Sequence, residues 1–166
     1  MRMLFLLAFV LTVFLFAYCG KSNGNENHIN CDGLITDTAG TNDNGKVYMP
    51  NAFTPNSDGI NDLSRPFTQN ITSINFTIYD ESNTVVFTTS VIGQGWATSS
   101  TPNKAVKYYY RIQATTTANH KIGMCGELYN LACFPTGIPK ANFFFEDQLT
   151  PFGFTGVTNE TLGNCP

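Results

Sequence analysis

The side chains best suited to metal chemistry gather between Thr54 and Arg65. With Thr54 at the first position of an EF-hand type of calcium loop, Asn56, Asp58 and Asp62 take the third, fifth and ninth positions, which supply oxygen ligands. The segment differs from an EF-hand loop at both ends, because Thr54 stands in place of the first aspartate and Arg65 in place of the last glutamate. Short Asn and Asp side chains also hydrogen-bond the backbone of turns. The sequence therefore favours a turn-rich loop without a cofactor, with calcium as the alternative at Asn56, Asp58 and Asp62.

Four cysteines predict a disulfide framework in an exported protein. Cys31, Cys125, Cys133 and Cys165 are even in number, and no CxxC spacing indicates zinc. The segment CGELYNLAC, from 125 to 133, is typical of a strand. Eight residues of strand at about 3.3 Å each would hold its two sulfurs roughly 26 Å apart. We therefore expect one bridge at each end of this strand, made with Cys31 and Cys165 in either combination.

Catalytic motifs are missing from the sequence. The two histidines, His28 and His120, have no nucleophile at motif spacing, and there is no G-x-S-x-G, HExxH or phosphate loop. Glu146 and Asp147 are adjacent, which is typical of solvated surface. The net charge is −3 at pH 7, which argues against nucleic acid as a partner. We expect a protein that is not an enzyme and does not bind nucleic acid.

The first residues indicate export. Arg2 is followed by MLFLLAFVLTVFLFAY, which has the basic start and apolar run of a secretory signal. Cys19 follows this run and precedes a polar stretch, which resembles the lipobox of bacterial lipoproteins, whose cysteine is lipidated. We expect residues 1–18 to be a signal peptide of the lipoprotein type and Cys19 to carry a lipid anchor. An ordinary cleaved signal and an uncleaved anchor helix are the alternatives.

The elements that position these side chains have the pattern of strands. Residues 19–45 are polar without apolar periodicity, which predicts a tether. Between residues 46 and 133, runs of Val, Ile, Tyr, Phe and Thr alternate with turn residues, and INFTIYD forms a hairpin with TVVFTT through the turn ESN. We expect an all-β fold, a small antiparallel β-sandwich, with residues 134–166 as a C-terminal extension stapled by a disulfide.

Alternation within the two clearest strands predicts which side chains form the core. In INFTIYD, the apolar face is Ile74, Phe76 and Ile78. In VKYYYRIQATTT, the apolar face is every second residue, namely Val106, Tyr108, Tyr110, Ile112 and Ala114.

The aromatic residues allow two interpretations. Trp96, the only tryptophan, fits a plug between strands, and the phenylalanines of the extension fit packing onto the sandwich. In the second interpretation, Trp96, Phe143, Phe152 and Phe154 belong to an exposed surface that binds a partner or a glycan.

The order of residues between 46 and 133 resembles the gliding-motility-associated C-terminal domain, the type B sorting domain of type IX secretion. The family pattern P-N-x-F-T-P-N-x-D-G-x-N-D falls on residues 50–62. It is followed by an F-x-I-Y strand with a hairpin to V-F, by Gly-Trp and by a Y-Y-Y strand. These later blocks fall on Phe76, Ile78, Tyr79, Val86, Phe87, Gly95, Trp96 and Tyr108 to Tyr110.

The resemblance implies an Ig-like β-sandwich at the cell surface, associated with the type IX secretion or gliding machinery. Sorting domains of this family ordinarily end a large cargo protein, whereas here the domain directly follows the signal segment. We therefore expect a stand-alone lipoprotein of the outer membrane, on the cell surface or the periplasmic face, that is a structural or interaction subunit of an outer-membrane complex. The alternatives are a carbohydrate-binding or adhesive module and a genuine type IX substrate. Asp37-Thr38-Ala39 also resembles the D-[ST]-A acceptor of this bacterial group, which makes Thr38 a candidate for O-glycosylation.

Overall fold

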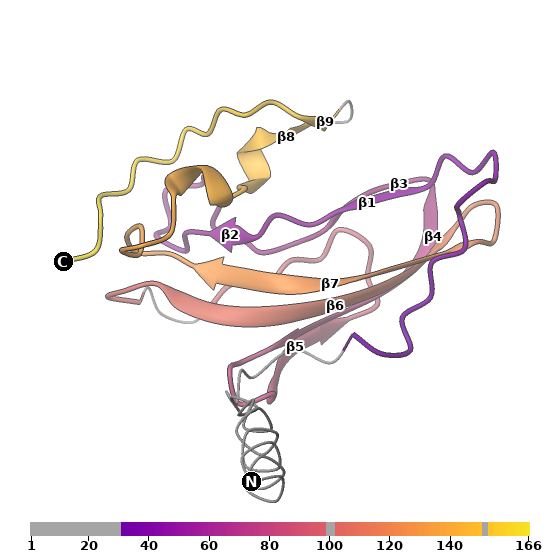
Figure 1. Cartoon of the computed structure of the whole chain (residues 1–166), viewed down its shortest axis with the longest axis horizontal. Coiled ribbons are helices and arrows are strands. Elements are labelled where there is room, and N and C mark those ends of the chain that lie inside the picture. The colour runs from indigo at the N-terminus through magenta and orange to yellow at the C-terminus, as the bar shows by residue number, and fades with distance from the viewer. Residues whose placement is uncertain (1–30, 99–101, 151–152) are drawn as a thin grey trace, which may run out of the picture.

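The structure is a computed structural model that describes residues 31–98, 102–150 and 153–166. It confirms the all-β prediction (Figure 1). The strands are β1 (Lys46–Tyr48), β2 (Ala52–Phe53), β3 (Phe67–Gln69), β4 (Ile71–Tyr79), β5 (Val85–Thr89), β6 (Val106–Thr116), β7 (Lys121–Asn130), β8 (Leu149–Thr150) and β9 (Gly153–Phe154). Two short 3-10 turns, η2 (Lys140–Asn142) and η3 (Glu146–Gln148), lie in the extension. Within the described ranges, no helix has the length and apolar character needed to cross a bilayer.

The main sheet has five strands in the order β2-β7-β6-β4-β5. Four of its strands pair antiparallel, as predicted, but β2 runs parallel to β7 at one edge. The antiparallel pair β1 and β3 lies over this sheet as the second layer, and β8 and β9 form a small separate pair (Figure 1). Because Val47 of β1 packs into the main core, the two layers form a sandwich.

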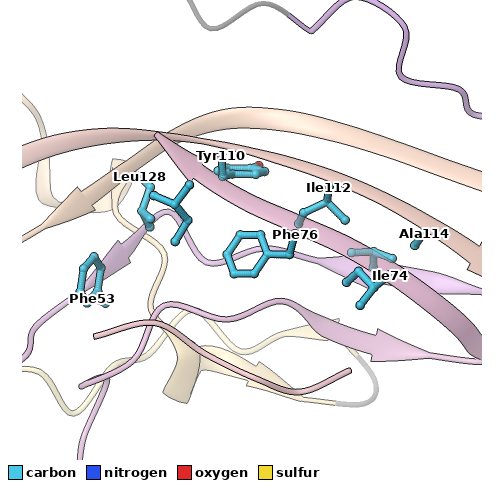
Figure 2. Packing of buried hydrophobic residues seen from close by; sticks show 9 residues of the cluster. Phe53, Ile74, Phe76, Tyr110, Ile112, Ala114 and Leu128 are labelled. Carbon is cyan, nitrogen blue, oxygen red and sulfur yellow. The ribbon is translucent and has the colours of Figure 1, made fainter. Parts of the chain in front are cut away.

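The core lies between the layers, on the face that alternation predicts. Ile74, Phe76 and Ile78 of β4 are each less than 5% exposed. In the register of the sheet, Phe76 lies opposite Ile112 and Ile78 lies opposite Tyr110, both on β6. Figure 2 shows Ile74, Phe76, Tyr110 and Ile112 of this core along the inner face of the sheet. The predicted hairpin is also confirmed, since β5 pairs with β4 after a turn at residues 81–84.

Residues 31–45 do not form the loose tether that their composition predicts. The amide of Gln113 bonds both the N–H and the carbonyl of Ile35, at 2.9 Å each, and Thr36 exchanges two hydrogen bonds with Gly123. A Cβ on Gly123 would lie 2.8 Å from Cβ of Leu34, so only glycine permits this approach. We call residues 31–37 the strap. The polar composition indicates a loose segment because it lacks apolar side chains to bury, but hydrogen bonds hold the strap in place.

Both disulfides join the segments that the sequence predicts. Cys31 bonds Cys125 within β7, and Cys133, three residues beyond the end of β7, bonds Cys165. The first bridge fixes the strap on the sheet. The second ties the end of the extension to the sandwich, next to a parallel bridge between Phe134 and Asn164.

A polar clamp closes the chain between the strap and β1. The carboxylate of Asp43, which is 0% exposed, accepts hydrogen bonds from the Thr116 hydroxyl and from the Gly45 N–H, and it lies 2.8 Å from Nδ1 of His120. The bond from Thr116, and next that from Gly45, lower the pKa of Asp43 below its usual value. The clamp therefore holds the carboxylate in its charged form.

Replacing Asp43 by asparagine is expected to destabilise the fold in a pH-dependent way. Because the pKa of Asp43 is depressed in the folded state, its contribution is complete above the unfolded value of about 3.9 and is lost as the pH falls through the folded pKa. The stability gap between wild type and Asp43→Asn, measured by urea unfolding, should therefore be constant above about pH 5 and shrink as the pH falls below about 4. A gap that does not shrink below about pH 4 contradicts this role.

Candidate functional site

The segment that contains β2 and the loop after it has an internal hydrogen-bond network made by its own acids. We call this segment, residues 50–65, the signature loop. The carboxylate of Asp62 accepts the N–H groups of Ser57 at 2.7 Å and Gly59 at 2.9 Å, and Asp58 accepts the N–H of Ile60 at 2.8 Å. Ser57 and Gly59 both have positive φ, so these bonds hold a backbone that most residues avoid. This network is the turn chemistry that the sequence predicts.

The same geometry gives no support to calcium at this loop. Asp58 and Asp62 direct their oxygens to backbone N–H groups, and Asn56 accepts the N–H of Asp58 and donates to its carboxylate. In the part of the chain that the structure describes, no three His, Cys, Asp or Glu side chains are grouped as metal ligands. The acids of the loop therefore act as turn acceptors.

Removing the carboxylate of Asp62 is expected to destabilise the protein by about 1–2 kcal/mol, because two backbone N–H groups lose a charged acceptor. Urea unfolding of Asp62→Ala measures this loss. The wild type should also melt at the same temperature with and without added calcium. A rise in the wild-type melting temperature on adding calcium, absent in Asp62→Ala, would restore the metal-loop hypothesis.

A second set of signature-loop side chains faces the C-terminal extension. Asn51 donates its amide to the carbonyl of Asn142 at 2.8 Å and accepts the N–H of Phe144 at 2.6 Å. Its backbone N–H donates to the carbonyl of Phe144 at 3.0 Å. The guanidinium of Arg65 pairs with Glu146, whose hydrogen bond raises the pKa of the arginine. In Figure 1 the extension lies over β2, on the same side of the main sheet as β1 and β3.

Glu160 reaches the centre of the signature loop from the far end of the extension. Its Oε2 accepts the Thr54 hydroxyl at 2.6 Å and the Asn61 amide at 3.2 Å. Thr54 is 1% exposed and Asn61 is 6% exposed, so both donors are buried beneath the extension. Asn61 also accepts the N–H of Asp147 at 3.0 Å.

The extension is itself held in shape by Asp147. The Asp147 carboxylate accepts the Thr158 hydroxyl at 2.9 Å and the Asn159 N–H at 2.6 Å. These bonds join the turn η3 to the returning tail. The interpretation of Glu146 and Asp147 as solvated surface is therefore wrong. Neither these residues nor Glu160 has a local pattern that reveals its partner, since each partner is more than ten residues away in sequence.

The aromatic residues of the extension divide between packing and exposure. Phe143 and Phe145 are 3% and 1% exposed and form a second core with Ala52, Leu131 and Phe134. Phe154 is 46% exposed and packs its ring against Phe144, with ring centroids 5.0 Å apart. Phe143 therefore packs in the core, whereas part of the Phe154 ring is exposed to solvent. Phe152 lies outside the described residues.

Trp96 packs between strands as a partly buried plug. Its ring lies between Phe53, at 5.5 Å, and Tyr108, at 5.0 Å, and its backbone exchanges two hydrogen bonds with Ser64. Of the described members of the predicted aromatic surface, Phe143 is buried, Trp96 is partly buried and Phe154 is exposed. Thr38 lies between the strap and the Asp43 clamp, and Cys19 lies outside the described residues.

The outer face of β6 and β7 carries a second group of titratable side chains. The carboxylate of Glu127 accepts a hydrogen bond from the ammonium of Lys107 at 3.2 Å and another from the phenol of Tyr129 at 2.6 Å. Contact with Tyr109, followed by that with Glu127, raises the pKa of Lys107, and burial raises the pKa of Tyr129 to about 12. At neutral pH the amine is therefore protonated and the phenol neutral, so neither is poised as a general base.

Comparison with known proteins gives one match. The model of the family described as the CHU_C type IX secretion signal domain matches residues 47–127. These residues include the signature loop and run through β6 into β7. No curated protein and no solved structure matches the chain.

Proposed function

Residues 47–127 of this chain belong to the family of type IX secretion signal domains, and on that premise we propose a lipid-anchored protein of the outer-membrane surface that acts by binding other proteins and not by catalysis. The family match supports the surface location in this proposal. It makes the chain a surface protein or substrate related to type IX secretion. The signature loop also contributes to the core, because the Phe53 side chain is 0% exposed.

The chemistry of the described residues supports an interaction role. Their clusters of acids, amides and hydroxyls are engaged in holding loops and the extension, as Asp62, Asp147 and Glu160 show. The sequence around Cys19 supports the anchor, because a lipobox-like cysteine follows an apolar export signal. A lipid would hold the sandwich beside the membrane proteins that it binds.

Membrane fractionation tests the anchor. Wild-type protein should sediment with the outer membrane, and Cys19→Ala should move to the soluble fraction while keeping the same unfolding curve. Cys31→Ala is not a suitable control, because that cysteine is bonded to Cys125. Identical fractionation of wild type and Cys19→Ala would exclude the lipid anchor at this residue.

Export in cells without a working type IX translocon tests the pathway. Protease added to intact wild-type cells should degrade the protein. In cells without the translocon, the protein should stay in the periplasm, where the added protease cannot reach it. Fusing residues 46–166 to a reporter separates the two forms of the proposal. Export of the fusion favours a genuine type IX substrate, and its retention favours a resident subunit whose sorting role is not used.

Cross-linking in native membranes, followed by affinity purification, tests the binding role. We expect an outer-membrane or secretion component to be recovered with the wild-type protein. Recovery of no membrane protein above the level of an untagged control would exclude the interaction role and leave only the anchored domain.

A further inference from the structure

We propose that the signature loop provides a docking site for a peptide segment that carries carboxylates and phenylalanines and is extended at the phenylalanines, and that the described residues of the segment 142–160 occupy this site in cis. We call the surface made by Asn51, Thr54, Asn61 and Arg65 the docking face. Each of these side chains bonds a residue of that segment.

The first contact is a set of hydrogen bonds from Asn51 to main-chain atoms of the segment. Asn51 bonds Phe144 through both its backbone and its side chain, and it bonds the carbonyl of Asn142 as well. The segment is extended here, because Phe143 and Phe145 both have β-region dihedrals and Phe143 and Phe145 point inward while Phe144 is exposed. Main-chain hydrogen bonds combined with pockets for alternate side chains are the usual means of binding an extended peptide.

The second contact requires a carboxylate. Thr54 and Asn61 are buried donors that converge on a single oxygen of Glu160. Thr54 has only one longer alternative, the carbonyl of Ile60 at 3.4 Å. Arg65 adds a charged donor for Glu146 at the edge of the face. Buried donors favour an occupant that supplies acceptors, and charged acceptors give the strongest bonds.

The docking face and its occupant come from different parts of the chain. Asn51, Thr54 and Asn61 lie within the family match, which ends at residue 127, whereas the occupant lies at 142–160. Three polar residues of the family pattern are therefore used to hold a segment outside the matched domain. A hollow of about 430 Å³ lies within the extension itself, between Phe143, Phe145 and the returning tail, and no residue of the docking face lines it.

A partner that uses this face must carry the same chemistry and must displace the segment. The occupant supplies two glutamates and the inward-pointing pair Phe143 and Phe145, and its backbone is extended at these phenylalanines and turns at Glu146, so a trans partner is an acidic and aromatic peptide that can adopt the same turn. In the intact protein the cis segment competes at high effective concentration, because the Cys133–Cys165 bridge ties both of its ends near the face.

Peptide binding tests this assignment. The probe is a fluorescein-labelled peptide of residues 140–162, which contains no cysteine. The full-length wild type is compared with Glu146→Ala/Glu160→Ala, whose own segment has lost both carboxylates. Fluorescence polarisation should show the probe binding the variant at least about tenfold more tightly than the wild type, because the cis competitor is weakened. A control peptide with the same two glutamates replaced by alanine should bind the variant at least about tenfold more weakly than the probe.

Two results would overturn the assignment: equal binding of the probe to both proteins, and no binding to the folded variant. If the double variant does not fold, Glu146→Ala is used, because Arg65 and Glu146 form a partly exposed pair at the rim. A variant that dimerises and is returned to monomer by the probe supports the same face with the segment of a second copy as its occupant.

Discussion

Replacing Cys31 and Cys125 together by serine is expected to lower the free energy of unfolding by about 4.7 kcal/mol, the largest effect of any change at a covalent link in this chain. The bridge joins residues 94 apart in sequence, so it removes much of the freedom of the unfolded chain. The strap also loses its covalent hold on β7, although its hydrogen bonds to Gln113 and Gly123 remain. Urea unfolding of the purified double variant measures the loss.

The second disulfide provides a matched comparison. Cys133 and Cys165 are 32 residues apart, and the same chain-entropy relation gives about 3.7 kcal/mol for their replacement by serine. The first pair should therefore cost about 1 kcal/mol more than the second. The reverse order would show that contacts of the extension, and not chain entropy, determine what each bridge contributes.

Truncating Phe53 to alanine is expected to cost about 3–5 kcal/mol, because a fully buried ring is removed and a cavity is left. Phe53 belongs to the signature loop, yet its ring lies in the core against Trp96. Thermal and urea unfolding should both show the loss, and near-UV circular dichroism should report the changed environment of the tryptophan.

Phe154 is the control for this prediction, because it is the same residue type at 46% exposure. Phe154→Ala should cost less than about 1 kcal/mol, since only the edge contact with Phe144 is lost. Similar losses for Phe53→Ala and Phe154→Ala would contradict the placement of Phe53 in the core.

The parts of the fold that sequence predicts are those that alternation controls. The inner faces of β4 and β6 follow from period-two burial, as Phe76 and Ile112 show, because a side chain on a half-buried strand must be apolar on one face only. Geometry excludes a bond between Cys125 and Cys133, because the chain between them is largely a strand, but it does not decide which of them bonds Cys31 and which bonds Cys165. These features depend on local backbone geometry, which the sequence carries directly.

The parts that sequence misses depend on contacts between distant polar groups. The parallel pairing of β2 with β7 rests on two residue pairs, and two residues are too few to set a pattern. The strap is bound through Gln113 and Gly123, and Glu160 is bound through Thr54 and Asn61. A hydrogen bond between residues about 80 or 100 apart leaves no periodic pattern in either segment, so the sequence does not reveal the bonding partners of Glu146, Asp147 and Glu160.

In the proposed lipid-anchored form, the bond between Cys31 and Cys125 would limit the distance between the sandwich and the membrane. Twelve Cα–Cα steps lead from Cys19 to Cys31, and they reach at most about 40 Å when fully extended. The hydrogen bonds of the strap to Gln113 and Gly123 hold residues 35 and 36 on the same sheet, so they would limit the length of this connection even without the bridge. The disulfide makes Cys31 the covalently fixed end of the connection.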